Sequence, residues 1–235
     1  MSIYMLSEEL SFPSPEDADG EGLLAVGGDL RPERLVLAYS LGIFPWYSDG
    51  DPLMWWSPDP RMVIRPGEFR PSTSLRRFGG KSGIRLSMDE AFEAVVRNCA
   101  RVPRHGQDGT WITDAMIQAY IELHRSGVGH SVECWEGDRL VGGLYGLSLG
   151  DCFFGESMFS KRSNVSKLAF WALMRHCKSV GIELVDCQLH NDHLERLGAY
   201  PISRTDFLAL LYRDVNAETR IGSWSDAFSA DVLLL

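Results

Sequence analysis

The sequence predicts an α+β protein whose main part is a mixed β-sheet. Three strand-like runs, at residues 130–136, 139–148 and 152–158, are separated by the turn signals Gly137-Asp138 and Gly150-Asp151. A helical pattern follows, and after it a further strand. Because a helix between two strands returns the chain parallel to its start, the sheet should be antiparallel before this helix and parallel across it.

The other elements follow from apolar spacing and from residues that start or stop helices. Ile182 to Leu189 read as the buried strand after the crossover helix, and no glycine or proline interrupts them. The expected helices are residues 32–41 ended by Gly42, one after a capping-box pattern at Ser87 and Glu90, one capped by Thr113 and ended by Gly127, and one capped near Ser163 or Asn164 and ended by Gly181.

The chain is expected to divide near residue 62. Residues 1–62 are rich in turns and should form a small N-terminal α/β domain, followed by a larger domain over residues 63–235. The sign of the local net charge changes at the same point. Residues 1–60 hold eleven acids and two bases, whereas residues 61–85 hold seven bases and one acid. The basic stretch is either a solvated face or a zone of contact with nucleic-acid phosphates.

Composition and the order of apolar residues argue against a disordered, a membrane-spanning, a secreted and a disulfide-stabilised protein. With 235 residues, 45% of them hydrophobic, the chain can bury an ordinary core. No apolar run approaches the roughly 18–20 residues that span a bilayer, and the first residues have no secretory pattern, so we expect a cytoplasmic monomer without a membrane partner. The cysteines form no CxxC pair, and an odd number of them favours reduced thiols over disulfides.

Polar residues interrupt two of the buried strands and indicate a site. Glu156 lies on one strand, and Asp186 and Gln188 lie on the strand that follows the crossover helix. Because side chains alternate along a strand, Asp186 and Gln188 should share a face and act on the same atoms. The alternative is that both are polar groups at a strand end, satisfied by neighbouring backbone.

A metal site is not expected. Cys187, His190 and His193 match no standard ligand spacing. Strand alternation also turns Cys187 away from Asp186, which disfavours a thiol nucleophile.

The predicted element order resembles the core of GNAT-like N-acyltransferases. Relatives of that type that use coenzyme A hold its pyrophosphate on a glycine-rich loop before the crossover helix. Here that connection, residues 160–166, reads SKRSNVS and contains no glycine. Since each Cβ keeps the backbone amides farther from a pyrophosphate, we expect no coenzyme A and no other cofactor, with the acyl group arriving on a different carrier.

Dispersed motifs resemble the leucyl/phenylalanyl-tRNA-protein transferase family. They are GLLAVGGDL at 22–30, GIFPWYS at 42–48, WWSPDPR at 55–61, GTWIT at 109–113, LVGGLYG at 140–146, GESMFS at 155–160 and VDCQLHNDH at 185–193. The resemblance implies transfer of leucine or phenylalanine, and less of methionine, from aminoacyl-tRNA to the N-terminal amine of proteins beginning with Arg or Lys. In bacteria this modification marks the acceptor for degradation by the N-end rule.

The same resemblance assigns roles to particular residues. Asp186 and Gln188 would be catalytic, Trp46 and Trp111 would contact the terminal adenosine of the tRNA, and Arg76 and Arg77 would contact its phosphates. The pocket for the transferred side chain would be formed by Leu144, Glu156, Met158, Phe170, Leu173 and Val185. Phe170 and Leu173 are exchanged relative to the usual family pattern.

Two other functions compete with this hypothesis. One is an aminoacyl-tRNA-dependent acyltransferase with a peptidoglycan-type or small-amine acceptor. The other is a noncatalytic module that binds RNA ends and would need Trp46 and Trp111 but not the catalytic pair.

Overall fold

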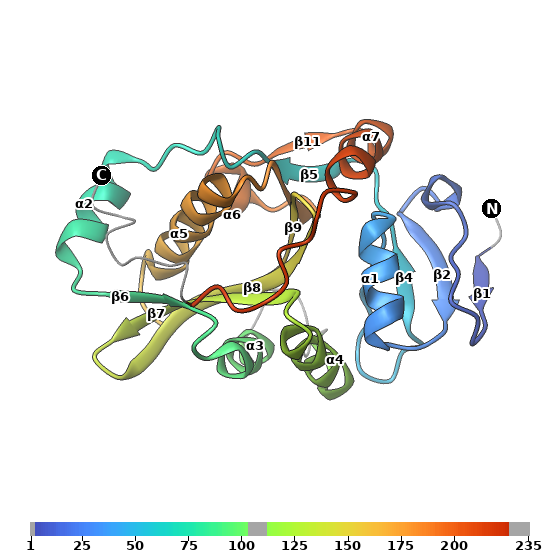
Figure 1. The fold of residues 1–235 in the computed structure, drawn as a ribbon, viewed down its shortest axis with the longest axis horizontal. Coiled ribbons are helices and arrows are strands. Elements are labelled where there is room, and N and C mark those ends of the chain that lie inside the picture. Colours follow the sequence, from blue (N-terminus) through green and yellow to red (C-terminus); the bar gives the residue numbers. More distant parts are fainter. Residues whose placement is uncertain (1–2, 103–111, 226–235) are drawn as a thin grey trace.

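Two β-sheets organise the described part of the chain (Figure 1). The computed structural model describes residues 3–102 and 112–225. The smaller sheet has the strand order β1-β2-β4-β3, and β2 pairs parallel with β1 and antiparallel with β4. Its strands are β1 (Tyr4–Leu6), β2 (Leu23–Gly27), β3 (Phe44–Pro45) and β4 (Met54–Trp56).

The larger sheet has the order β11-β5-β10-β9-β8-β7-β6. Strands β6 to β9 pair antiparallel with one another, whereas β9 and β10 pair parallel across the crossover helix. The mixed sheet and the α+β class are therefore confirmed, including the change from antiparallel to parallel pairing. Its strands are β5 (Arg61–Ile64), β6 (Arg85–Met88), β7 (Gly129–Glu136), β8 (Arg139–Leu149), β9 (Cys152–Ser160), β10 (Leu184–Gln188) and β11 (Tyr200–Ile202).

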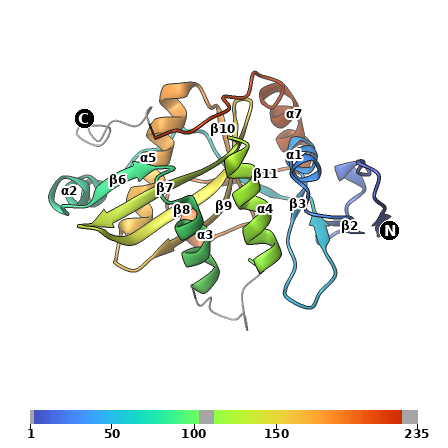
Figure 2. The same ribbon diagram turned by 60° about the horizontal axis from the view of Figure 1, so that its bottom comes forward.

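Helices cover both faces of the larger sheet (Figure 2). The crossover helix α5 lies on one face, and α3 and α4 lie on the other, while α1 connects to the smaller sheet. The helices are η1 (Pro15–Asp17, a 3₁₀ turn), α1 (Pro32–Ser40), α2 (Thr73–Lys81), α3 (Phe92–Arg101), α4 (Asp114–Arg125), α5 (Val165–Val180), α6 (Asp192–Glu195) and α7 (Arg204–Asp214).

Most predicted helix ends are confirmed. Thr113 Oγ1 accepts the Met116 N–H at 3.3 Å and so caps α4. Asn164 precedes α5, and Gly181 ends it with a φ of 81°, a left-handed conformation that glycine adopts without strain. Gly127 follows α4 in the same way.

The capping box predicted at Ser87 and Glu90 is wrong. Ser87 lies in β6, and its hydroxyl donates to Glu133 at 2.6 Å instead of capping a helix. Glu90 pairs with Arg85, and α3 begins only at Phe92. A buried carboxylate on the neighbouring strand thus competes successfully for the serine hydroxyl.

The two sheets share one apolar core. Leu24 and Trp55 of the smaller sheet belong to the same buried cluster as Tyr120 of α4 and Tyr145 of β8. A second cluster lies between α5 and the opposite face of the larger sheet. The N-terminal residues therefore form one wall of the main core, and the domain boundary at residue 62 stays a prediction.

Two further predictions can be compared with the structure. All five cysteines are free thiols, and four of them are buried, in agreement with the reduced state expected. Among the described residues, no helix is both long enough and apolar enough to cross a membrane.

Candidate active site

A cavity opens where β9 and β10 separate. The parallel pairing of these strands runs from Leu184 opposite Cys152 to Asp186 opposite Phe154. The cavity, of about 570 Å³, is lined by the residues that follow on both strands, by α5, by the segment 44–46 and by residues 189–191, 193 and 194. Ligands commonly bind at such a point, beyond the carboxyl ends of parallel strands.

A β-bulge interrupts each of these strands at the cavity. On β9, Gly155 pairs with Gly146 and Ser157 with Tyr145, so Glu156 is the extra residue. On β10, Asp186 pairs with Val63 and Gln188 with Met62, so Cys187 is the extra residue. A bulge changes the direction of the side chains beside it. The bulges therefore explain why Glu156 and Gln188 both line the cavity.

The structure brings most of the predicted site residues together. The cavity is lined by Leu144, Glu156, Met158, Phe170, Leu173 and Val185, together with Gln188 and Trp46. Trp111 lies outside the described residues.

Asp186, in contrast, does not line the cavity. The strict alternation expected to put Asp186 and Gln188 on one face is broken by the bulge, and that expectation is wrong. Val185, Cys187 and Gln188 face the cavity, while Asp186 faces Arg61.

Asp186 is held in a buried ion pair. Arg61 donates from Nε to Asp186 Oδ1 at 2.9 Å and from Nη2 to Oδ2 at 2.7 Å, and both side chains are 1% exposed. The guanidinium also donates to the Gly42 carbonyl at 3.1 Å and lies over the rings of Phe44 and Phe207. Arg61, which the sequence places in a surface basic stretch, is instead an interior residue.

The same carboxylate fixes the backbone of Gln188. Asp186 Oδ1 accepts the Gln188 N–H at 2.8 Å. Gln188 has a φ of 64°, an uncommon conformation for a residue with a Cβ. Such strain persists where surrounding contacts hold it and is frequent at functional sites. Asp186 is therefore positioned to orient Gln188.

Glu156 lies at the centre of a buried hydrogen-bond network. Oε1 accepts from Tyr39 at 2.7 Å and from Gln188 Nε2 at 2.7 Å, and Oε2 contacts the Tyr120 hydroxyl at 2.6 Å. Burial raises the pKa of Glu156 to about 7, although its hydrogen bonds oppose this shift. Burial also raises the pKa values of Tyr39 and Tyr120 well above 10. Neither tyrosine is among the sequence-predicted site residues.

Trp46 is a partly buried wall of the cavity. Its ring packs edge-on against Trp56, with ring centroids 5.6 Å apart. Trp56 Nε1 donates to the Trp46 carbonyl at 2.7 Å, which fixes the backbone beside the indole. An aromatic face held in this way can stack on a base.

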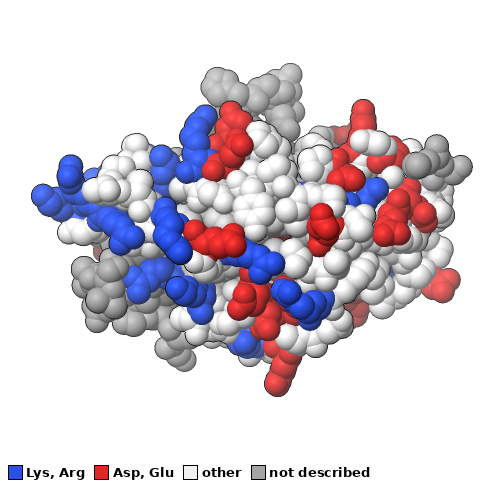
Figure 3. Space-filling model, turned by 90° about the horizontal axis from the view of Figure 1, so that it is seen from above, with Lys and Arg blue, Asp and Glu red and all other residues white. Residues whose placement is uncertain are grey.

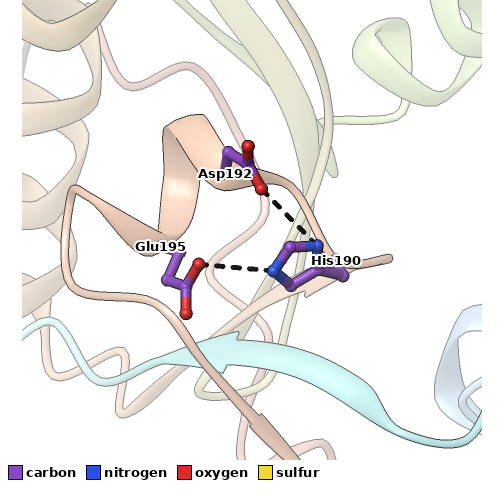
Figure 4. Close-up of side chains that lie close together, drawn as sticks. All are labelled: His190, Asp192 and Glu195. Atoms are coloured by element: carbon purple, nitrogen blue, oxygen red, sulfur yellow. Dashed lines mark hydrogen bonds and ion pairs between the residues drawn. The ribbon is translucent and has the colours of Figure 1, made fainter.

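A cluster of polar side chains lies beside the cavity-lining residues (Figure 4). His190 Nε2 is 3.4 Å from Glu195 Oε2, and His190 Nδ1 is 4.0 Å from Asp192 Oδ1. All three side chains are more than half exposed. The three are close enough to offer ligands to a cation, but exposed groups of this kind commonly hold none. Burial raises the pKa of Cys187, so it is not a ready thiolate ligand.

The predicted phosphate contacts lie on a different part of the surface. Arg76 and Arg77 are exposed on α2 and do not line the cavity. A groove beside them, of about 490 Å³, carries Arg70, Arg76, Arg175 and Lys178. Figure 3 shows basic side chains gathered at the end of the molecule where α2 lies in Figure 1, and acidic ones toward the N-terminal sheet.

Comparison with known proteins decides the family. The family model "Leucyl/phenylalanyl-tRNA protein transferase" matches residues 63–212, and the model of its N-terminal domain matches residues 28–59. A protein named leucyl/phenylalanyl-tRNA–protein transferase from Anaeromyxobacter sp. (strain K) is 53% identical over 95% of this chain and 96% of its own length. One of the same name from Myxococcus xanthus (strain DK1622) is 49% identical over 98% of this chain and 100% of its own length.

The chain belongs to the leucyl/phenylalanyl-tRNA-protein transferase family. It is accordingly an aminoacyltransferase that uses aminoacyl-tRNA and protein acceptors. The family identification made from the motifs is confirmed.

Solved structures align with this transferase at low TM-scores and low sequence identity. A GCN5-related N-acetyltransferase from Kribbella flavida is 12% identical, with a TM-score of 0.39 over 70% of this chain and 58% of that chain. The L-PGS structure from Bacillus licheniformis is 14% identical, with a TM-score of 0.40 over 72% of this chain and 53% of that chain.

The sequence does not predict three of the residues that form this transferase's site. Tyr39 lies in the helix expected over residues 32–41 and has no role assigned from the sequence. Tyr120 reads as an inward-facing position of the helix capped by Thr113, and Arg61 reads as part of the basic stretch at residues 61–85. Tyr120 does follow the buried stripe of α4, but nothing in that spacing shows that its hydroxyl meets a carboxylate from β9. The motif WWSPDPR contains Arg61, and its place at the start of the apolar run of residues 62–64 is the one signal that could have indicated burial.

Proposed function

We propose that this enzyme transfers leucine or phenylalanine, and less methionine, from aminoacyl-tRNA to the N-terminal amine of proteins beginning with Arg or Lys. The product is marked for degradation by the N-end rule, and the reaction takes place in the cytoplasm. One observation carries the proposal: a single cavity contains an apolar wall, a carboxamide, a carboxyl group and an aromatic ring. Together these match the side chain, the reacting ester and the terminal adenosine of the donor.

The apolar wall would hold the transferred side chain. Leu144, Phe170, Leu173 and Val185 are each at most 3% exposed, and Met158 is partly buried. An unbranched-at-Cβ side chain such as that of leucine or phenylalanine would bury apolar surface against them, at roughly 25 cal/mol per Å². Trp46 would stack on the adenine of the CCA end, for about 1–3 kcal/mol.

The reaction needs alignment more than chemical activation. The acceptor amine attacks the ester carbonyl carbon, a C–N bond forms, the C–O bond to the ribose breaks, and the amine proton passes to the released ribose hydroxyl. A terminal amine has an ordinary pKa of about 7.7–8.0, so part of it is neutral near pH 7. Holding amine and ester in reacting geometry can contribute roughly 7–11 kcal/mol in ideal cases.

Gln188 and Asp186 would supply that alignment. Gln188 donates Nε2–H to Glu156, and its carboxamide oxygen remains to accept an N–H of the acceptor amine. Asp186 holds the Gln188 backbone and is itself neutralised by Arg61. We therefore assign Gln188 the contact with the reacting amine and Asp186 the role of positioning residue, instead of a general base.

Two surface features support the proposed binding of tRNA and of acceptors with a cationic first residue. The basic groove beside α2 would contact acceptor-stem phosphates, as expected for Arg76 and Arg77. Carboxylates Asp192 and Glu195 lie beside the cavity-lining segment and favour a cationic first residue on the acceptor.

Product formation tests this function. The purified enzyme is incubated with radiolabelled Leu-tRNA and a peptide that begins with Arg, and in parallel with the same peptide beginning with Ala. We expect label on the Arg peptide and little on the Ala peptide. Equal labelling would reject the acceptor specificity, and transfer only to a small amine would favour a different acceptor class.

A further inference from the structure

The hydroxyl groups of Tyr39 and Tyr120 and the carboxyl group of Glu156 form a closed triangle of contacts beside Gln188. Tyr39 Oη lies 2.7 Å from Glu156 Oε1, Tyr120 Oη lies 2.6 Å from Glu156 Oε2, and the two tyrosine oxygens lie 2.6 Å from each other. All three distances are those of O–H···O hydrogen bonds, which require a proton between each pair of oxygens.

The number of protons decides the charge of this triangle. The two tyrosines carry one hydroxyl proton each, and burial raises both pKa values, so neither loses its proton near neutral pH. If Glu156 is ionised, two protons must serve three contacts. When both hydroxyls donate to the carboxylate, the tyrosine oxygens face each other at 2.6 Å with no proton between them. A third proton removes this conflict.

We propose that Glu156 is a neutral carboxylic acid in the resting enzyme, held in a closed ring of hydrogen bonds by the positioning residues Tyr39 and Tyr120. Glu156 Oε2–H donates to Tyr120, Tyr120 donates to Tyr39, and Tyr39 donates to Glu156 Oε1. The same Oε1 accepts the second contact, from Gln188 Nε2–H. Every contact in the network then has a donor and an acceptor.

The surroundings favour the uncharged form. Tyr39 of α1 and Tyr120 of α4 are 0% and 1% exposed, and Glu156 is 8% exposed. Asp186 of β10 acts electrostatically on Glu156, and Tyr145 of β8 acts on both tyrosines. Cys187, His190 and His193 line the same cavity as Glu156. The Asp186 carboxylate raises the pKa of Glu156, and Arg61 of β5 pairs with Asp186 and not with Glu156. No described cation forms an ion pair with Glu156.

A neutral Glu156 has a consequence for the reaction, and this step rests on the proposed function. The acid orients the Gln188 carboxamide by accepting its N–H, so that the carboxamide oxygen remains for the acceptor amine. An anion at the same place would favour the ammonium form of that amine, which cannot attack. The ring therefore orients the amide and avoids a buried negative charge beside the nucleophile.

Infrared difference spectroscopy of the free enzyme tests the protonation directly, because a protonated carboxyl and a carboxylate have separate carbonyl bands. Wild type minus Glu156→Gln should contain one protonated-carboxyl band below neutral pH, which disappears on raising the pH to about 9. Tyr120→Phe should shift this band, since the acceptor of the acid proton is lost. Only a carboxylate band for Glu156 at about pH 5–6 would overturn the proposal.

Glu133→Gln is the matched control. Glu133 is also buried and hydrogen-bonded to hydroxyls, those of Ser87 and Ser131, but it does not line the cavity. Its substitution should leave the Glu156 band and its response to Tyr120→Phe in place. A Tyr120→Phe protein with an unshifted Glu156 band would show that no such ring exists.

A kinetic measurement separates this inference from the proposed function. The rate of transfer to an Arg-initiated peptide should rise with pH as the amine deprotonates and fall as Glu156 ionises. The Glu156→Gln enzyme should lack the fall at high pH. Its kcat should exceed that of Glu156→Ala by about tenfold. Absence of transfer by the wild type, with the infrared band present, would reject the proposed function alone. Normal transfer without the band, or Glu156→Gln no better than Glu156→Ala, would reject the ring.

Discussion

Arg61 and Asp186 form a two-point ion pair in the protein interior, with both side chains 1% exposed. The pair joins β5 to β10, and Asp186 also fixes the strained backbone of Gln188. Its main contribution is therefore positional: it aligns the residue that faces the cavity.

Replacing Asp186 with Asn should leave the Arg61 charge buried and unpaired. Removing one partner of a buried pair typically costs about 3–5 kcal/mol, so we expect a loss of that order in the free energy of unfolding, measured by urea denaturation. The exposed pair Arg97–Glu93 provides the control, since Glu93→Gln should cost less than about 1 kcal/mol. Equal effects of the two substitutions would contradict the structure.

Trp46→Ala should weaken binding of the aminoacyl-adenosine end. The loss of one stacking surface is expected to cost about 1–3 kcal/mol in affinity for a puromycin-like mimic, measured by calorimetry. Trp135→Ala is a suitable comparison, because Trp135 is a partly buried indole on β7 that does not line the cavity. If both variants bind the mimic as the wild type does, Trp46 does not contact the adenosine.

Exchanging Phe170 and Leu173 should change the choice of donor. The double variant Phe170→Leu/Leu173→Phe keeps the total side-chain volume, so it should lose less than about 1.5 kcal/mol of stability. Because both residues line the cavity, the ratio of transfer from Leu-tRNA and Phe-tRNA in a competition assay should change by up to about tenfold. Leu168→Met, on the same helix but away from the cavity, should not alter the ratio.

Arg76→Ala should reduce the salt dependence of tRNA binding. If Arg76 neutralises one phosphate, the slope of log affinity against log salt concentration should fall by about one, as titrations at several salt concentrations would show. Arg139→Ala removes an exposed arginine that is paired with Glu136 and should leave the slope unchanged. A wild-type affinity independent of salt would exclude phosphate contacts altogether.

The stability of the enzyme should depend on pH through Glu156. Folding raises the pKa of this residue from an ordinary 4.5 to about 7, so the folded state holds the proton more tightly. Glu156 therefore contributes about 3 kcal/mol to the free energy of unfolding below pH 4.5. This contribution is lost as the pH rises to about 7. The unfolding free energy of the wild type minus that of Glu156→Gln should fall over this range. A constant difference would show that the pKa is not raised.

Local patterns were sufficient for much of the fold. Alternation, turn residues and capping residues predicted β7, β8, β9, α4 and α5, because these elements are long and bounded by strong signals. The same patterns do not predict β6, α2 or α7, and they place Ser87 in a helix cap. Its hydroxyl instead meets Glu133, a residue distant in sequence.

The sequence by itself determined the family and the fold class, since these follow from ordered motifs and from spacing along the chain, and the family resemblance named several of the residues that line the cavity. Only the tertiary structure decided what those residues do. Two β-bulges turn Glu156 and Gln188 toward each other, and Asp186 is directed to Arg61 instead of the cavity. The physical reason is that hydrogen bonds and ion pairs depend on atoms brought together from distant segments, which periodicity within one segment cannot specify.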